Sequence, residues 1–191
     1  MCMFFKKISK FRGKPFSLKD AKNIGIPRSY IRKWLEEDKI EKVSHGFYKI
    51  NIDEYDKETP LIDAVSIVGK PSVICLLSAL EFYNITDQIP KKTWIMVPAT
   101  KKCSNKRLRL YRTRNPMWDI GIDKHNNYAI TSIERTLVEC LLFKKILGLP
   151  VVMQAIKEAL RMKQTTLSDI IKMANKMSVY HRIEGAIEAL I

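Results

Sequence analysis

The stretch PRSYIRKWLEEDKIEKVSHGFY, residues 27–48, predicts a short helix followed directly by a β-hairpin. Pro27 suits the start of the helix, because its missing N–H group would have no partner there. Ile31, Trp34 and Leu35 stand at positions i, i+3 and i+4, so they form one apolar stripe that we expect to be buried. Most of the other side chains of this helix are basic or polar, and we expect them to face outward.

The hairpin is predicted from two short extended pieces, residues 40–43 and 47–50, joined by the turn Ser44-His45-Gly46. Glycine in such a turn can take a positive φ. A helix with basic residues on its outer side, followed at once by a small hairpin, is typical of a winged helix-turn-helix. In that fold the helix enters the DNA major groove and the hairpin contacts the backbone.

Two further helices are expected before this stretch, over residues 1–11 and 16–23. Ser17 is suited to cap the second of them, with Asp20 three residues later as the acid of a capping box. Gly25 ends that helix and leaves a short turn before the basic helix. The spacing is therefore that of a helix-turn-helix.

The N-terminal region is strongly basic, with thirteen Lys or Arg against five Asp or Glu in residues 1–52. A solvated basic face on an ordinary helical hairpin is the plainer interpretation, but charge, turn spacing and hairpin together favour DNA binding. For His45, a phosphate or minor-groove contact and plain solvent exposure are equally open. The expected DNA contacts are Arg28, Ser29, Tyr30, Arg32, Lys33, Lys42 and His45.

The composition of the 191-residue chain points the same way. Its net charge is +14 and its pI is near 9.7, an excess that favours a polyanionic partner. Cys2, Cys75, Cys103 and Cys140 lack the paired spacing of a zinc or redox motif, so we expect reduced thiols and a cytoplasmic protein. The N-terminus lacks the charge order of a secretory signal, and lysines interrupt the longest apolar stretches, so no membrane span is expected.

Residues 51–58, NIDEYDKE, are polar and acidic and are interpreted as a linker. We predict an α+β protein with a winged helix-turn-helix domain over residues 1–52 and a second domain over residues 59–191, built from a small sheet and a helical bundle. The elements expected in the second domain are helices over 59–68 and 72–83, strands over 93–97, 107–113, 120–122 and 128–130, and helices over 132–147, 150–163, 166–177 and 179–190.

Several segments of the chain resemble the AbiEi family, the antitoxins of abortive-infection toxin–antitoxin systems. The winged-helix stretch GIPRSYIRKWLEEDKIEKVSHGFYKI, residues 25–50, is similar to that of the family. Glu139 departs from the family pattern, which often has Asp at this position. The segments that resemble the family in the second domain are ICLLSALEFYNITDQIP (74–90), TWIMVP (93–98), TSIERTLVECLLF (131–143) and AIKEALRMK (155–163).

The resemblance implies a division of labour between two domains. One domain would repress its own operon by binding inverted repeats in the promoter DNA. The other would counteract a co-encoded nucleotidyltransferase-like toxin, with or without a stable complex. A stand-alone DNA-binding transcriptional regulator is the alternative.

Three residues of the second domain allow more than one interpretation. Arg135 and Glu139 are four apart on one helix face, which fits either an exposed ion pair, the interpretation we favour, or a buried Arg that clamps the sheet to the bundle. Ser78, inside an apolar helix, is expected to bond to its own backbone rather than act as a nucleophile. The histidines of the whole chain, His45, His125 and His181, lie in different elements, with no acid at triad-like spacing. We therefore expect no catalytic histidine.

A nucleic-acid-processing enzyme is a second class of function for so basic a chain. A nuclease would need clustered acids to hold metal ions. The acids here are dispersed and lie mostly in expected loops. We therefore expect no catalytic residue, no metal and no cofactor.

A second basic cluster lies in the second domain, with seven positive charges in fourteen residues and no acid. The bases are interleaved with Leu108, Leu110 and Tyr111, as in a half-buried strand. A solvated face is the plainer interpretation, and we favour a surface that faces the toxin or nucleic acid. This basic segment comprises Lys101, Lys102, Lys106, Arg107, Arg109, Arg112 and Arg114.

Overall fold

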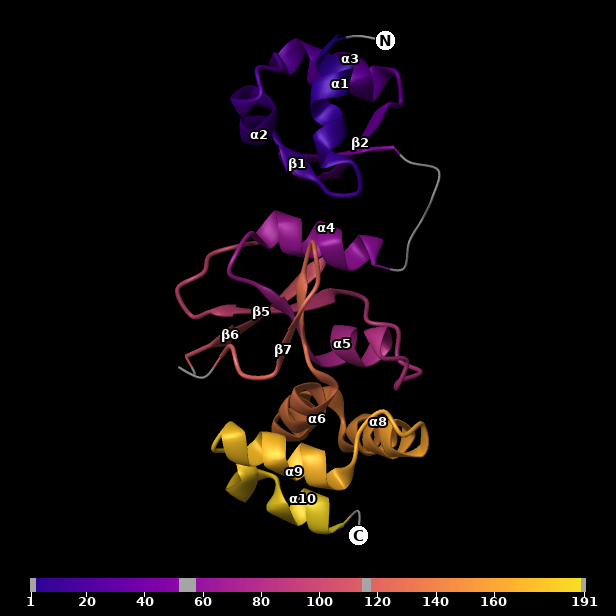
Figure 1. The fold of residues 1–191 in the computed structure, drawn as a ribbon, viewed down its shortest axis with the longest axis vertical. Helices are drawn as coiled ribbons and strands as arrows, with labels where there is room; N and C mark the ends of the chain where they lie inside the picture. The colour runs from indigo at the N-terminus through magenta and orange to yellow at the C-terminus, as the bar shows by residue number, and fades with distance from the viewer. Residues whose placement is uncertain (1–2, 52–57, 115–117, 190–191) are drawn as a thin grey trace. The chain divides into compact units, whose positions relative to one another are not determined.

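The structure is a computed structural model that describes residues 3–51, 58–114 and 118–189. It divides into two compact units, Met1–Lys70 and Pro71–Ile191. Both units combine helices with a small sheet, which confirms the predicted α+β class (Figure 1). Within the described ranges, no helix is long and apolar enough to cross a membrane.

The first unit contains a winged helix. Its three-stranded sheet has the order β1-β3-β2. Helices α2 and α3 form the helix-turn-helix (Figure 1). Trp34 of α3 belongs to the same core cluster as the buried side chains of Ile8 and Phe16, and its ring centroid lies 5.4 Å from that of the Phe5 ring. The elements are α1 (Met3–Ile8), the 3-10 helix η1 (Ser9–Phe11), β1 (Phe16–Ser17), α2 (Leu18–Asn23), α3 (Arg28–Glu36), β2 (Ile40–Ser44), β3 (Phe47–Ile50) and α4 (Thr59–Val68).

The predicted helix over residues 16–23 begins two residues later than expected. Phe16 and Ser17 form a short strand opposite Tyr48 and Phe47 of β3. The predicted capping box is confirmed: the Ser17 hydroxyl accepts from the Asp20 N–H at 3.1 Å, and the Asp20 carboxylate accepts from the Ser17 N–H at 2.8 Å. A capping residue has extended backbone, so Ser17 caps α2 and pairs with β3 at the same time.

Most of the predicted linker, residues 52–57, lies outside the described residues. The division into compact units assigns α4 to the first unit, whereas the sequence analysis places it in the second domain. Lys49 of β3 is nearly buried and donates to Asp63 of α4 at 3.0 Å, so this lysine belongs to the interior of the unit. The domain limits 1–52 and 59–191 stay a prediction.

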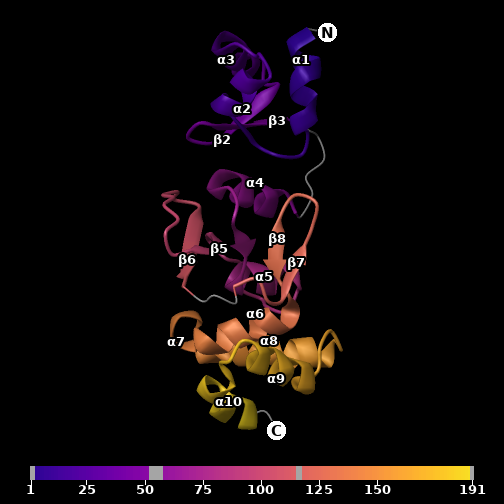
Figure 2. The ribbon, with the colours of Figure 1, turned by 60° about the vertical axis from the view of Figure 1, so that its left-hand side comes forward.

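The second unit is a five-stranded mixed sheet with a helical layer (Figure 2). The strand order is β6-β5-β4-β8-β7, with β5 parallel to β6 and β4 parallel to β8. The elements are β4 (Val73–Ile74), α5 (Leu76–Phe82), β5 (Thr93–Pro98), β6 (Leu108–Thr113), β7 (Ile122–Lys124), β8 (Ala129–Thr131), α6 (Ile133–Leu142), α7 (Lys144–Leu147), α8 (Leu149–Arg161), α9 (Leu167–Lys176), the 3-10 helix η2 (Tyr180–Arg182) and α10 (Glu184–Glu188).

The prediction of one helix over residues 72–83 is wrong at its start. Ile74 is the central residue of the sheet, paired with Ile95 on one side and Ile130 on the other. A strand buried on both faces is a continuous apolar run, which periodicity alone does not separate from a buried helix. Leu76, with φ +50°, lies at the change from β4 to α5.

The expected local bond of Ser78 is also wrong. Its hydroxyl accepts a hydrogen bond from the Trp94 N–H at 3.0 Å and so ties α5 to β5. The predicted helix over residues 132–147 ends at Leu142, and α7 follows after Phe143. The last predicted helix, residues 179–190, is divided into η2 and α10.

Candidate nucleic-acid interface

Helix α3 presents an exposed basic side. Pro27 is its N-cap, with φ −65° and ψ 147°, and it offers no side-chain cap, while the Tyr30 N–H donates to the Pro27 carbonyl at 3.0 Å. Ile31 and Trp34 point into the core, as predicted, and Leu35 is half-buried. The outward residues Arg28, Ser29, Arg32 and Lys33 are exposed.

Two of these bases are engaged by acids on the same helix face. Arg32 Nε lies 3.2 Å from Glu36 and Lys33 Nζ lies 3.8 Å from Glu37. Exposed pairs of this kind are worth little, so a phosphate can replace the carboxylates. Arg28 makes no ion pair within the described ranges, which makes it the most available base of the helix.

Tyr30 differs from the other expected contacts, because its ring is part of the packing. The ring lies 4.7 Å from that of Phe4 and 5.8 Å from that of Trp34, measured between centroids. The contact between the Tyr30 and Phe4 rings orients α3 on α1, and the Tyr30 side chain is half-buried.

The hairpin of β2 and β3 places Lys42 and His45 in exposed positions, as expected. Gly46 has φ +75°, and the register of the two strands shifts between Lys42 and Ser44. A bulge of this kind increases the local twist of a hairpin. Thus two of the predicted contacts lie on the wing itself.

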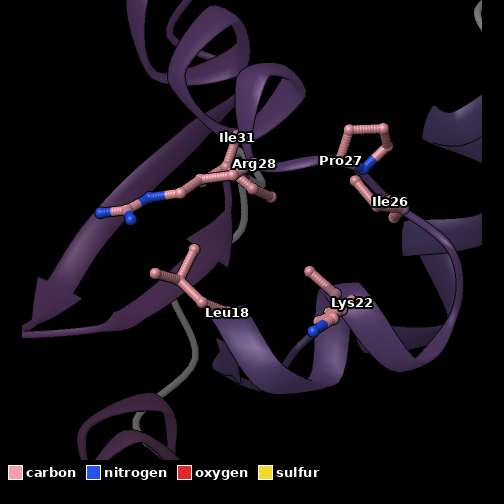
Figure 3. Close-up of a pocket in the computed structure, with 7 residues that line it drawn as sticks. Leu18, Lys22, Ile26, Pro27, Arg28 and Ile31 are labelled. Carbon is pink, nitrogen blue, oxygen red and sulfur yellow. The ribbon is translucent and has the colours of Figure 1, made fainter.

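A cavity of about 410 Å³ opens between α2 and α3 (Figure 3). Leu18 and Ile31 form part of its apolar wall, and Lys22 and Arg28 are the charged side chains around it. The aliphatic part of Arg28 lies along this opening while its guanidinium extends away from it (Figure 3). Arg28 is exposed, so its guanidinium is accessible to a ligand outside the cavity.

The basic segment of the second unit follows the edge strand β6 and the loop before it. The Arg109 guanidinium lies over the Trp94 ring, 4.1 Å from its centroid, and Arg112 Nε donates to the Lys101 carbonyl at 3.3 Å. Strand alternation puts Arg112 on the same side of β6 as Leu108 and Leu110 and on the opposite side from Arg109, so the arginines of this strand do not share one face. The contact of Arg109 with Trp94 could not be predicted from the sequence, since it requires the parallel register of β5 and β6.

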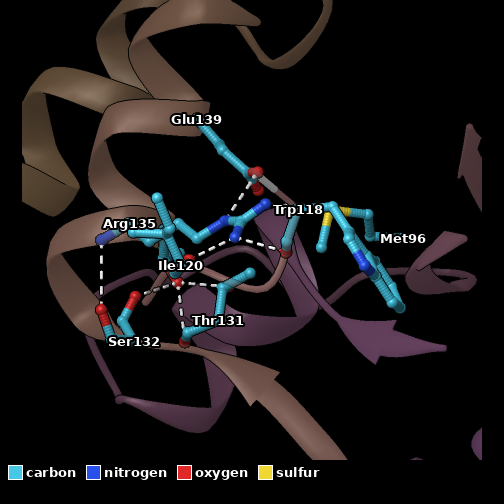
Figure 4. Close-up of polar contacts among 8 residues, drawn as sticks. Met96, Trp118, Ile120, Thr131, Ser132, Arg135 and Glu139 are labelled. Atoms are coloured by element: carbon cyan, nitrogen blue, oxygen red, sulfur yellow. Dashed lines mark hydrogen bonds and ion pairs between the residues drawn. The ribbon is translucent and has the colours of Figure 1, made fainter. Parts of the chain in front are cut away.

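Arg135 and Glu139 form a buried polar cluster, so the favoured interpretation of an exposed pair is wrong (Figure 4). Arg135 Nε donates to Glu139 at 3.1 Å, and the same guanidinium donates to the carbonyls of Trp118, at 2.6 Å, and Ile120. The clamp joins α6 to the segment before β7. Burial raises the pKa of the Glu139 carboxyl although Arg135 acts in the opposite direction.

The described residues include side chains of the types that ligate metals or act as nucleophiles. Among them, no group of three or more His, Cys, Asp or Glu side chains is placed to hold a metal ion. The His125 ring stacks on the Tyr128 ring, with the two centroids 4.5 Å apart. Burial raises the pKa of the Cys75 and Cys140 thiols well above the usual range of a thiol. Thiols of this kind are inert as nucleophiles.

Comparison with known proteins finds a family similar to the N-terminal region. Residues 6–50 match the family described as transcriptional regulator, AbiEi antitoxin, which confirms the resemblance over this part of the chain. No curated protein matches the sequence. The crystal structure of the Rv2827c protein from Mycobacterium tuberculosis is similar in fold, with a TM-score of 0.60 and 10% identity over 92% of this chain and 72% of that chain.

Proposed function

We propose that this chain, whose residues 6–50 match the AbiEi antitoxin transcriptional regulators, binds its own promoter as a repressor and counteracts a co-encoded nucleotidyltransferase-like toxin. The observation that carries the DNA-binding part is the exposed basic side of α3 on a winged-helix scaffold. The promoter site is double-stranded DNA with inverted repeats. The protein acts without a catalytic residue of its own.

In this proposal α3 enters the major groove. Arg28, with no carboxylate partner in the described ranges, contacts a base edge or a phosphate near the helix start. Arg32 and Lys33 exchange their weak carboxylate partners for phosphates. Lys42 and His45 contact the backbone from the wing.

Replacing Arg28, Arg32 and Lys33 together with alanine tests this interface. Each lost phosphate contact should reduce the salt dependence of promoter binding, measured as the slope of log K against log salt, by about 0.9. A lost base contact should cost about 1–3 kcal/mol and relax the preference at one base pair. The measurement is fluorescence anisotropy with a labelled promoter duplex at several salt concentrations.

The matched control removes three exposed lysines of the second unit, Lys145, Lys157 and Lys163. It lowers the net charge equally and should leave the salt slope near that of the wild type. If the α3 variant binds the promoter as tightly as the wild type, α3 is not the recognition helix.

The division of labour is part of the proposal: residues 1–52 bind DNA, and residues 59–191 counteract the toxin. The test is survival of cells that express the toxin encoded next to this chain. The second fragment should rescue them, and the first should not. Rescue by residues 1–52 alone would assign the antitoxin activity to the first domain and contradict this part of the proposal.

A stand-alone transcriptional regulator is the second candidate, favoured by the restriction of the family match to residues 6–50. The two candidates differ in gene context and in the rescue assay. An antitoxin has a nucleotidyltransferase-like reading frame beside its gene and restores growth. A stand-alone regulator binds the promoter equally well but gives no rescue.

A further inference from the structure

The basic segment lies along an edge of the five-stranded sheet. β6 pairs with β5 and is the last strand on its side, and Figure 2 shows it at the rim of the unit with the preceding loop beside it. No acidic residue occurs between residues 99 and 118. In the described part of the chain, Arg109 and Arg112 form no ion pair with a carboxylate. The rim therefore has a concentrated positive charge that no acid of the segment offsets.

The charges surround this rim rather than cover one flat face. Arg109 lies on the Trp94 side of β6, and Arg112 lies on the opposite side by strand alternation. The bond from Arg112 Nε to the Lys101 carbonyl joins the loop to the strand. A flexible polyanion can follow such a rim and reach both sides, whereas a rigid duplex would meet only one of them.

Arg109 also provides a surface for stacking. Its guanidinium lies 4.1 Å from the centroid of the Trp94 ring, and Trp94 is 8% exposed. The indole holds one face of the planar guanidinium by a cation–π contact. Arg109 as a whole is exposed, so a second planar group can stack on it from outside. Unpaired nucleobases stack on arginine planes in this way.

We propose that this edge of the second unit binds single-stranded nucleic acid, with one unpaired base stacked on Arg109 and phosphates held by the surrounding Lys and Arg side chains. The inference rests on the proposed division of labour, in which the second domain works apart from the winged helix. A protein strand that pairs with β6 is disfavoured, because Lys and Arg along an edge strand oppose such pairing. Lys102, Lys106, Arg112 and Arg114 are the exposed bases available for phosphates.

The test uses the full chain and two fluorescent 12-nucleotide probes, oligoadenylate and an abasic strand of the same charge. The wild type should bind oligoadenylate about tenfold more tightly than the abasic strand. Arg109→Lys keeps the charge but not the plane, so it should bind both probes equally, with an unchanged salt slope. Arg112→Ala should retain the preference for bases and reduce the salt slope by about 0.7.

The control variant is Lys157→Ala with Lys163→Ala, two exposed lysines in α8 and just after it rather than on β6 or the loop before it, and it should behave as the wild type on both probes. If wild type and Arg109→Lys bind the two probes alike, no base stacks on Arg109 and the proposal fails. If an oligoglutamate of equal charge displaces the labelled oligoadenylate as well as unlabelled oligoadenylate does, the edge is a docking site for an acidic protein instead. If the wild type binds neither probe, the proposal is also wrong.

The same samples keep this inference apart from the proposed promoter binding. The α3 triple variant should lose the promoter duplex but keep the preference for oligoadenylate over the abasic strand, and Arg109→Lys should lose that preference but keep the promoter duplex. Loss of promoter recognition alone by Arg109→Lys would assign the edge to the DNA footprint of the winged helix and overturn the inference.

Discussion

Replacing Arg135 with methionine removes the guanidinium at the centre of the buried cluster while keeping an unbranched apolar side chain. In the native protein the Arg135 and Glu139 side chains are 1% and 3% exposed, and the guanidinium also serves the carbonyls of Trp118 and Ile120. Removing one partner of a buried ion pair costs about 3–5 kcal/mol. Each carbonyl left without a donor adds about 1–3 kcal/mol.

The expected loss is therefore about 5 kcal/mol or more, which is comparable with the whole stability of many domains. Urea unfolding of the full chain, followed by circular dichroism and tryptophan fluorescence, measures it. Trp94 and Trp118 report on the second unit and Trp34 on the first. We expect the early transition of the variant to involve the second unit, with the first unit unchanged.

A second variant separates the charge from the packing. Replacing both Arg135 and Glu139 with methionine removes the unpaired carboxylate that the single change leaves buried, so the double variant should be the more stable of the two by several kcal/mol. If Arg135→Met lowers the free energy of unfolding by less than about 1 kcal/mol, the reasoning is refuted, because so small a loss would mean that water solvates the pair of Arg135 and Glu139. A double variant less stable than the single one would show that packing, not charge, dominates.

Three further changes test particular contacts. Burial raises the pKa of the Glu139 carboxyl in the folded chain above the ordinary 4.5. Below pH 4.5 the carboxyl is protonated in both the folded and the unfolded chain, so its burial does not lower the stability there. Stability should fall as the pH rises through the raised pKa, and Glu139→Gln should flatten that fall in urea midpoints from pH 4 to 8. Ser17→Ala removes the cap of α2 and should cost the first unit about 1 kcal/mol, seen as a lower melting temperature, whereas Ser17→Asp should retain it. Gly121 has φ +65°, and a Cβ there would lie 3.1 Å from Arg135 Cβ, which the backbone of α6 holds in place, so Gly121→Ala should cost more than the roughly 1–2 kcal/mol of backbone strain alone. Gly13→Ala, with open space around it, should show only the backbone part; equal losses at the two glycines would contradict the close contact.

Local signals were sufficient for the winged helix. The capping box at Ser17, the stripe of Ile31 and Trp34 and the turn at Gly46 all act between residues near in sequence. Backbone propensity and side-chain periodicity express such interactions directly, so the prediction of the helix-turn-helix and its wing from the sequence agrees with the structure. The exposure of Arg28 follows from the same periodicity.

The second unit depends on contacts between residues far apart in the chain, and there the sequence was ambiguous. The strand at Ile74 was indistinguishable from a helix until its two neighbours, at Ile95 and Ile130, were known. The spacing of Arg135 and Glu139 is the same for an exposed and a buried pair, because only the surrounding carbonyls and core determine their solvation. The charge of the basic segment could be read from the residues alone, but the placement of Arg109 over Trp94 required the parallel register of two strands, which no local pattern encodes.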